Sequence, residues 1–278
     1  MKKLYRTAPL PFQGQKRKFV SKFVKVIKNY YDGVTFVDLF GGSGLLSHTV
    51  KYYKPKSNVV YNDYDGFSER IKNIQITNQI INEIRKIVQV PHLKPIVGGG
   101  RNDILNLLNE KECFVDYITI SKNILFSGRY VTNYEDLSKE GFYNMISKNE
   151  YAEADDYLDG LTIVKMDYRD LFELYKYDEK AVFIVDPPYL NTDCGTYSEQ
   201  WCFEQYLDVI KLLKGKRFVY FTSSKSKIVE MCNFFSKNNV ADVFDNCIIE
   251  NSDTTINHTS NYTDIMIFND NYDERTLF

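Results

Sequence analysis

The chain has 278 residues, of which 44% are hydrophobic and 26% charged, and its formal net charge is −2. This is the composition of a soluble globular protein, large enough for one big domain or for one domain with an insertion. It excludes a polycation that binds nucleic acid by overall charge, and the chain has no run of about 18 apolar residues to span a membrane. The start, Met1–Arg6, lacks the apolar stretch of a signal peptide, so a cytoplasmic location is expected.

Cysteine and histidine usage favours a reducing compartment and no metal site. The five cysteines are an odd number without C-x-x-C spacing, and the three histidines lie far apart. Charge is unevenly distributed: residues 1–31 hold nine Lys or Arg and no acid, whereas residues 239–278 hold eight acids and one Arg. The basic segment is either a face that meets phosphates or an ordinary solvated helix.

The first third of the chain alternates helices and strands, which predicts βαβ units and a parallel sheet. A glycine turn, Gly41–Gly44, separates the first strand from the helix that follows it. The predicted elements are an amphipathic helix over 16–31, a strand over 34–40, a helix over 45–53, a strand over 59–62 and a long helix over 66–89.

Beyond residue 90 the alternation lapses and later resumes. Residues 90–160 are expected to form an inserted, mostly helical subdomain, with a helix over 134–148, between two parts of a main domain, 1–89 and 161–278. The last two strands lack a helix between them, so they predict a hairpin with an antiparallel last strand and a polar, mobile loop over 251–261. The other predicted elements are strands 161–165, 181–185, 217–221, 242–249 and 262–268, with helices 201–214 and 225–237.

The stretch Val182–Tyr189 is a buried strand that stops abruptly. An apolar run typical of a parallel strand ends at Asp186, and Pro187 and Pro188 cannot continue its hydrogen-bond ladder. Asp186 therefore lies at the strand's carboxyl end, where open α/β sheets bind ligands. The prolines stiffen the loop, and Tyr189 adds a flat ring for stacking.

A second ligand signal surrounds the turn Phe40–Gly44. Strand, glycine turn, helix and then Asp63 at the end of the next strand describe a pocket for a ribose-bearing ligand. The turn lacks the full G-x-G-x-x-G pattern and the Lys-Ser/Thr of a phosphate loop, which disfavours NAD or ATP. Asp63 is alternatively a plain helix cap, and Asp38 an ordinary strand-end acid.

Together, the F-x-G-x-G turn, Asp63 and the D-P-P-Y of Asp186–Tyr189 resemble the S-adenosylmethionine-dependent amino-methyltransferases. Pro11–Lys16 is similar to the P-F-x-x-G-G-K segment of the Dam-like, D12-class DNA adenine-N6 methyltransferases, and the motif order along the chain is theirs. One departure is Gln15, which stands where that segment has its second glycine. The resemblance spans Phe12 to about Phe268.

The resemblance implies a Rossmann-like, seven-stranded α/β methyltransferase sheet with an antiparallel last strand and an inserted target-recognition subdomain. It also implies roles for individual residues. Asp167 would meet the cofactor's adenine, although it is equally suited to cap the helix after it, and Lys16 belongs either to the cofactor site or only to the basic helix. The implied catalytic residues are Asp186, Pro187, Pro188 and Tyr189. The implied cofactor-binding residues are Phe12, Gln13, Gly14, Lys16, Asp38, Phe40, Gly41, Gly42, Ser43, Gly44, Asp63, Asp167 and Asp186.

The expected reaction is methyl transfer from S-adenosyl-L-methionine to N6 of a DNA adenine at a specific site, without a metal. Because a base inside a duplex cannot reach the pocket, the adenine must flip out, and Tyr189 would stack on it. Lys122 and Arg129 would contact phosphate or a base edge, although an incidental surface loop explains their charge as well, and Tyr197 would contact DNA from a flap. A monomer from a bacterium or phage is expected, with restriction–modification as one setting. Alternatives are an RNA adenine methyltransferase and a DNA-binding protein with a weak or vestigial cofactor site.

Overall fold

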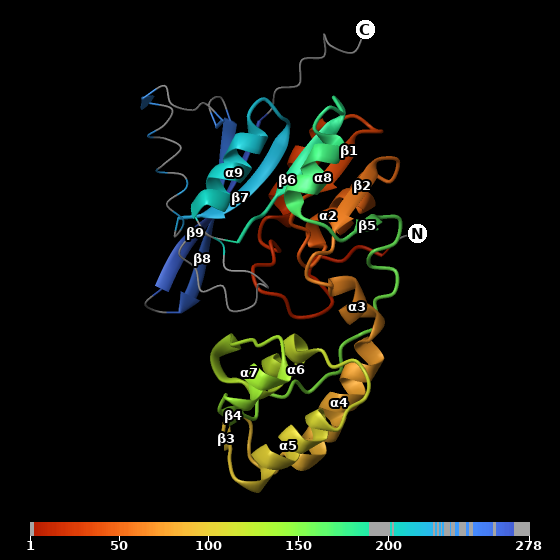
Figure 1. Cartoon of the computed structure of the whole chain (residues 1–278), viewed down its shortest axis with the longest axis vertical. Helices are drawn as coiled ribbons and strands as arrows, with labels where there is room; N and C mark the ends of the chain where they lie inside the picture. Colours follow the sequence, from red (N-terminus) through yellow and green to blue (C-terminus); the bar gives the residue numbers. More distant parts are fainter. Residues whose placement is uncertain are drawn as a thin grey trace. The chain divides into compact units, whose positions relative to one another are not determined.

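In the computed structural model the chain divides into two compact units, each considered by itself (Figure 1). Unit 1 comprises Met1–Thr7, Gln15–Asp65 and Leu158–Phe278, and unit 2 comprises Ala8–Gly14 and Gly66–Tyr157. The structure describes residues 3–188, 201, 203–224, 226, 228, 230, 234, 237–238, 243–244, 247–257 and 260–269. Within these residues, none of the helices has the length and apolar character needed to cross a bilayer.

Unit 1 is built on a seven-stranded sheet with the order β5-β2-β1-β6-β7-β9-β8. The strands from β5 to β7 are parallel, whereas β9 runs antiparallel to both β7 and β8. The predicted parallel sheet with a terminal antiparallel hairpin is therefore confirmed. The strands are β1 (Thr35–Asp38), β2 (Asn58–Asn62), β5 (Thr162–Val164), β6 (Ala181–Val185), β7 (Phe218–Ser223), β8 (Cys247–Asn257) and β9 (Ser260–Asn269).

Both faces of the central strand β6 are buried, which is why its sequence is continuously apolar. Phe183 and Val185 belong to one hydrophobic core, and Val182 and Ile184 to a second core on the opposite face. Helices α8 and α9 contribute to the first core and helices α1 and α2 to the second. The helices of unit 1 are α1 (Val20–Asn29), α2 (Leu45–Tyr53), α8 (Tyr168–Tyr175) and α9 (Phe203–Leu213).

The prediction of a mobile loop over 251–261 was wrong. The β8–β9 ladder continues through this polar stretch to the pair Asn257↔Ser260, with one irregularity between Thr255 and Asn257. The backbone groups of a hairpin pair with each other whatever the polarity of the side chains. Hydropathy alone therefore underestimated the length of both strands. Most of the predicted helix 225–237 lies outside the described residues.

Unit 2 is mostly helical and has its own core. Its apolar residues include Ile84 of α4, Ile104 of α5 and Ile120 of α6. The elements are α3 (Phe67–Lys72), α4 (Ile74–Ile87), β3 (Pro95–Ile96), α5 (Gly99–Asn109), α6 (Tyr117–Ile124), the 3₁₀ turn η1 (Phe126–Gly128), α7 (Tyr134–Ser138) and β4 (Phe142–Tyr143).

The longer stretch of unit 2 runs from Gly66 to Tyr157, whereas the inserted subdomain is expected over 90–160; it includes α4, which buries its apolar face in this core. Two predicted helices are also shorter than expected. The helix over 66–89 is interrupted at Asn73, whose φ of −105° is not helical. The helix over 134–148 ends at Ser138, ahead of Gly141, and β4 then pairs with β3.

Replacing Ile84 with alanine tests the assignment of α4 to the core of unit 2. Ile84 is fully buried, so the truncation should lower the free energy of unfolding by about 2–5 kcal/mol. Urea denaturation measures the loss, and amide hydrogen exchange should show weakened protection in α5 and α6. The matched control is Lys86→Ala, an exposed position on the same helix. A loss for Ile84→Ala no larger than the control's would contradict the assignment.

Candidate functional site

Three acids lie at the carboxyl edge of the sheet in unit 1. Asp38 is the last residue of β1, while Asp63 and Asp186 directly follow β2 and β6. The strand β1 pairs with β2 on one side and with β6 on the other, and Asp38 is level with Ile184 of β6. Because all three strands are parallel, the acids gather at one edge, as their positions in the sequence predict.

The glycine turn is shaped by close backbone approach and by left-handed torsion. A Cβ on Gly41 would lie 2.2 Å from the ring of Tyr61 and 2.6 Å from the carbonyl oxygen of Asn62. Gly44 has a φ of +69° and is the N-cap of α2, and its N–H donates to the carbonyl of Gly41 (2.8 Å). A residue other than glycine would be sterically excluded at position 41 and strained at position 44.

Two residues of β2 that the motifs did not identify hold the site together. The buried hydroxyl of Tyr61 lies 3.0 Å from Asp63 Oδ1 and 2.8 Å from the carbonyl of Gly42. Asn62 donates from Nδ2 to the carbonyls of Leu39 and Met166, each at 3.0 Å. The one sequence signal for them is their place directly before Asp63, because a polar Asn ending a buried strand needs partners.

Lys16 and Asp186 form a buried ion pair. Lys16 Nζ lies 2.6 Å from Asp186 Oδ2, and the two side chains are 6% and 16% exposed. Lys16 precedes α1 and is turned inward, so the alternative that it belongs only to the solvated basic helix was wrong. In the described part of the chain, no group donates a hydrogen bond to Asp186 Oδ1. Burial raises the pKa of the Asp186 carboxyl, and the adjacent Lys16 opposes that rise.

Asp38 is a second buried acid on this edge. Its Oδ2 accepts a hydrogen bond from the hydroxyl of Ser47 (2.6 Å). Burial, with a smaller contribution from the charge of Asp186, raises the pKa of Asp38 to about 7, against the opposing effects of Ser47 and Lys16. At neutral pH this carboxyl is therefore close to half protonated.

Aromatic rings gather next to the glycine turn. The ring of Phe40 lies 5.0 Å from that of Tyr168 and 5.3 Å from that of Trp201, and Trp201 lies 5.3 Å from Tyr206. The hydroxyl of Tyr206 donates to the carbonyl of Pro188 and so anchors the proline loop. The sequence motifs identified Phe40 but missed the other three rings of this group, whose only signal is that Trp201 is the sole tryptophan of the chain.

Asp167 is confirmed as the N-cap of α8. Its Oδ1 accepts from the backbone N–H of Arg169 at 2.7 Å, and Arg169 Nη1 lies 3.6 Å from its Oδ2. Its side chain is 44% exposed, so a ligand can still reach it. Ser43, in the glycine turn, is buried.

The remaining predicted residues are distributed over both units. Phe12, Gln13 and Gly14 belong to unit 2, where the ring of Phe12 contacts that of Phe67 edge-on at 5.8 Å. Lys122 is exposed on α6, and the exposed Arg129 pairs with Glu140 at 2.8 Å. Tyr189 and Tyr197 lie outside the described residues.

The raised pKa of Asp38 gives a pH dependence of stability with a definite sign. The pKa of about 7 in the folded state exceeds the ordinary aspartate pKa of 3.8, so the folded state binds more protons between these values and stability falls as pH rises through that window. Asp38→Asn removes this effect. The free energy of unfolding of the variant minus that of the wild type should rise between about pH 5 and pH 7, by up to about 1.4 kcal/mol per pH unit. Urea titrations across that range measure the difference, and a flat difference would contradict a raised pKa.

Comparisons with known proteins identify a methyltransferase family. Residues 12–237 match the model of the D12 class N6 adenine-specific DNA methyltransferase family. A putative methyltransferase of Haemophilus influenzae is 34% identical over 245 residues, which cover 85% of this chain and 82% of that protein. Modification methylase LlaI of Lactococcus lactis is 24% identical over 237 residues, which cover 76% of this chain but only 36% of that longer protein.

Among solved structures, a precorrin-6y C5,15-methyltransferase of Geobacter metallireducens is similar over 96% of this chain and all of its own, with 8% identity and a TM-score of 0.35. The fold assignment depends on the strand order of unit 1 and not on that likeness. With the family match covering most of the chain, and the glycine turn and strand-end acids placed on one sheet, the chain belongs to the D12 class of N6 adenine-specific DNA methyltransferases.

Proposed function

We propose that this methyltransferase moves a methyl group from S-adenosyl-L-methionine to N6 of an adenine flipped out of duplex DNA at a specific sequence. The observation that carries the proposal is the asymmetry of Asp186. One carboxylate oxygen is bound to Lys16, and the other is buried without a donor among the described residues. A buried acceptor oxygen without a donor is costly, and an exocyclic amine would satisfy it.

The residues of unit 1 fit the cofactor chemically. An edge that carries three carboxyl groups suits a ligand with a sulfonium and an ammonium group, because a bound cation would favour the charged form of the carboxyls beside it. Asp63, oriented by Tyr61, would accept hydrogen bonds from ribose hydroxyls, and the rings of Phe40 and Trp201 would lie against the adenine. When bound, the cofactor supplies an electrophilic methyl group on sulfur.

The protein's own contribution is to align the amine and make its nitrogen more nucleophilic. The N6 lone pair is delocalised into the adenine ring, and acceptors on the two N–H groups favour a more tetrahedral nitrogen. Asp186 Oδ1 would be the charged acceptor and the carbonyl of Pro187 the neutral one. Lys16 would restrict the orientation of the Asp186 carboxylate by binding its Oδ2. Tyr206 would restrict the proline loop by donating to the carbonyl of Pro188, next to the Pro187 acceptor.

Methyl transfer leaves a proton to be removed from the nitrogen. The raised pKa of Asp186 makes its carboxylate a better proton acceptor than an ordinary aspartate, so Oδ1 would accept that proton before product release. Tyr189 would stack on the flipped base and offset part of the cost of unstacking it, by roughly 1–3 kcal/mol.

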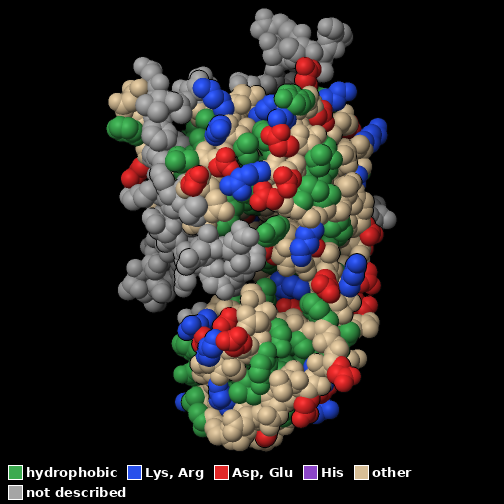
Figure 2. All heavy atoms as spheres, in the orientation of Figure 1, with side chains coloured by type: hydrophobic (Ala, Val, Ile, Leu, Met, Phe, Trp, Pro, Cys, Tyr) green, Lys and Arg blue, Asp and Glu red, His purple; other side chains and the backbone are tan. Residues whose placement is uncertain are grey.

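Unit 2 would read the DNA sequence through the segment 121–131, which includes Lys122 and Arg129. On the described surface that Figure 2 presents, basic and acidic side chains are interspersed rather than gathered by sign. Recognition would therefore depend on a few placed groups more than on a broad positive face. The name of the LlaI relative, a modification methylase, supports a role in a restriction–modification system.

Asp186→Asn tests the catalytic assignment with little change in volume. Because the neutral amide is a weaker acceptor and no proton acceptor, kcat for methylation of DNA adenine should fall by at least about a hundredfold. Cofactor affinity, measured by calorimetry, should change less than about tenfold. The matched control is Asp170→Asn, an exposed position on α8. A variant at Asp186 with wild-type kcat would refute the assignment, and mapping of methylated adenines in DNA from expressing cells identifies the substrate.

Arg129→Ala tests DNA reading by unit 2. Removing one phosphate contact should weaken binding of a duplex and lower the slope of log affinity against log salt by about 1, whereas loss of a base contact should relax site preference. Fluorescence anisotropy over a salt series measures the first effect and methylation mapping the second. Lys111→Ala, which removes a cation paired with Glu83 in the same unit, is the control. If neither quantity changes at Arg129, this residue does not read DNA.

A further inference from the structure

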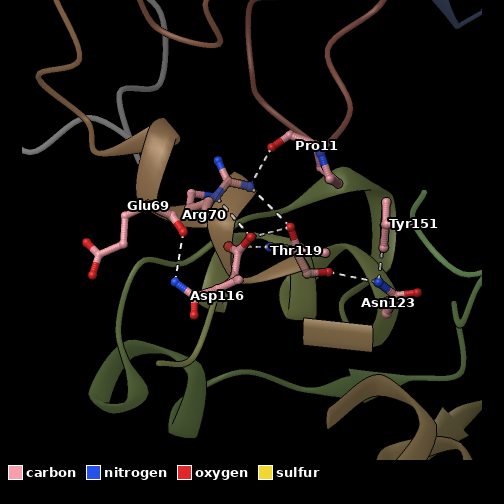
Figure 3. A network of polar contacts seen from close by, with 8 residues as sticks. Pro11, Glu69, Arg70, Asp116, Thr119, Asn123 and Tyr151 are labelled. Atoms are coloured by element: carbon pink, nitrogen blue, oxygen red, sulfur yellow. Dashed lines mark hydrogen bonds and ion pairs between the residues drawn. The ribbon is translucent and has the colours of Figure 1, made fainter. Parts of the chain in front are cut away.

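Arg70 of α3 joins three segments of unit 2 (Figure 3). Its Nε lies 3.0 Å from Asp116 Oδ2, and its Nη2 donates to Thr119 Oγ1 at 3.1 Å and to the carbonyl of Pro11 at 2.7 Å. Asp116 is the N-cap of α6, and Thr119 lies in the first turn of that helix. One guanidinium group therefore connects the N-terminal segment 8–14, α3 and the start of α6.

The Arg70–Asp116 pair is buried deeply enough to be costly. The two side chains are 6% and 1% exposed, and Asp116 also accepts from the backbone N–H and the hydroxyl of Thr119 at 3.0 and 2.6 Å. Desolvation of such a pair cancels much of its attraction, and well-packed apolar residues are often as stable. What apolar residues cannot supply is a directional bond to the Pro11 carbonyl, so the pair is better suited to positioning than to stability.

One end of this connection leads to the cofactor segment. Phe12 packs its ring on Phe67 of α3, directly after the carbonyl that Arg70 holds. Only a few residues further along the chain, Lys16 binds Asp186. The conformation of Pro11–Gly14 thus limits the positions that Lys16 can reach.

The other end leads to the segment that would read DNA. The last turn of α6, which ends at Ile124, is the start of that segment, and the backbone N–H of Val131 at its far end donates to Ser121 Oγ of the helix at 3.2 Å. Burial raises the pKa of the Tyr130 phenol, and the positive charge of Arg70 opposes that rise. In the described part of the chain, no acceptor binds Arg70 Nη1. A shift of segment 121–131 can therefore reach Arg70 through α6, where Thr119 accepts its hydrogen bond.

We propose that Arg70 is a positioning residue that couples the two binding events of the reaction, so that DNA on segment 121–131 tightens the hold of segment 11–16 on the cofactor. The coupling rests on the proposed function, because it requires these two segments to bind DNA and cofactor. Linkage makes it reciprocal, so the cofactor must tighten DNA binding by the same factor. Lysine does not reproduce this arrangement, because its three donors share one nitrogen, whereas Arg70 uses Nε for Asp116 and the separate Nη2 for Thr119 and Pro11.

The experiment measures the dissociation constant of sinefungin, an unreactive analogue of S-adenosylmethionine, without DNA and with saturating sheared DNA that lacks adenine methylation. The wild type should bind the analogue about tenfold more tightly with DNA. In Arg70→Lys, which keeps the buried charge paired, that ratio should fall to within about twofold of one. Arg70→Met with Asp116→Asn removes both charges while keeping the N-cap, and should lose the coupling as well.

Arg85→Met is the matched control, because Arg85 donates hydrogen bonds to Asn82 and to the carbonyl of Ser147 in the same unit and not to the Pro11 carbonyl that Arg70 binds. It should keep the wild-type ratio, and thermal unfolding establishes that each variant is folded. The proposal is overturned if folded Arg70→Lys keeps the wild-type ratio, or if the wild type itself shows a ratio of one. Absence of sinefungin binding by the wild type would instead contradict the proposed function, and the coupling with it.

Discussion

The ion pair between Lys16 and Asp186 is the interaction on which the chemistry of the sheet edge depends. Burial raises the pKa of both Asp186 and Asp38, and Lys16 opposes the rise at each. Without this ammonium group, the two neighbouring buried carboxyls would both favour the neutral form more strongly. The segment that carries Lys16 therefore sets the charge of the sheet edge at which Asp38 and Asp186 lie.

The order of the sheet explains why so much of this edge was predictable from the sequence. In a parallel sheet buried on both faces, each strand is an apolar run, and the first polar residue after it must lie at the edge. Asp63 and Asp186 are such residues. Gly41 and Gly44 were predictable for a related reason, since tight turns between strand and helix need residues without a side chain.

The site residues and packing partners that the sequence did not predict depend on contacts between residues far apart in the chain. In the sequence, Tyr61 is an ordinary strand residue, but its hydroxyl donates toward both the Gly42 carbonyl and Asp63. Trp201 contacts Phe40 although the two lie far apart in the chain. An amphipathic helix shows that one face is buried but not against which partner, so the packing of α4 in the core of unit 2 could not be predicted from its sequence. The length of the β8–β9 hairpin was underestimated because backbone pairing does not depend on the hydropathy of the side chains.

The contact between Gly41 and Tyr61 has a consequence for engineering this enzyme. The ring of Tyr61 occupies the space that a methyl group at position 41 would need, and the same ring carries the hydroxyl that orients Asp63. Positions 41 and 61 therefore have to be redesigned as one unit, although they lie on different segments of the chain. A mutant library that varies them independently would consist largely of clones with a collision at one position or a missing support at the other.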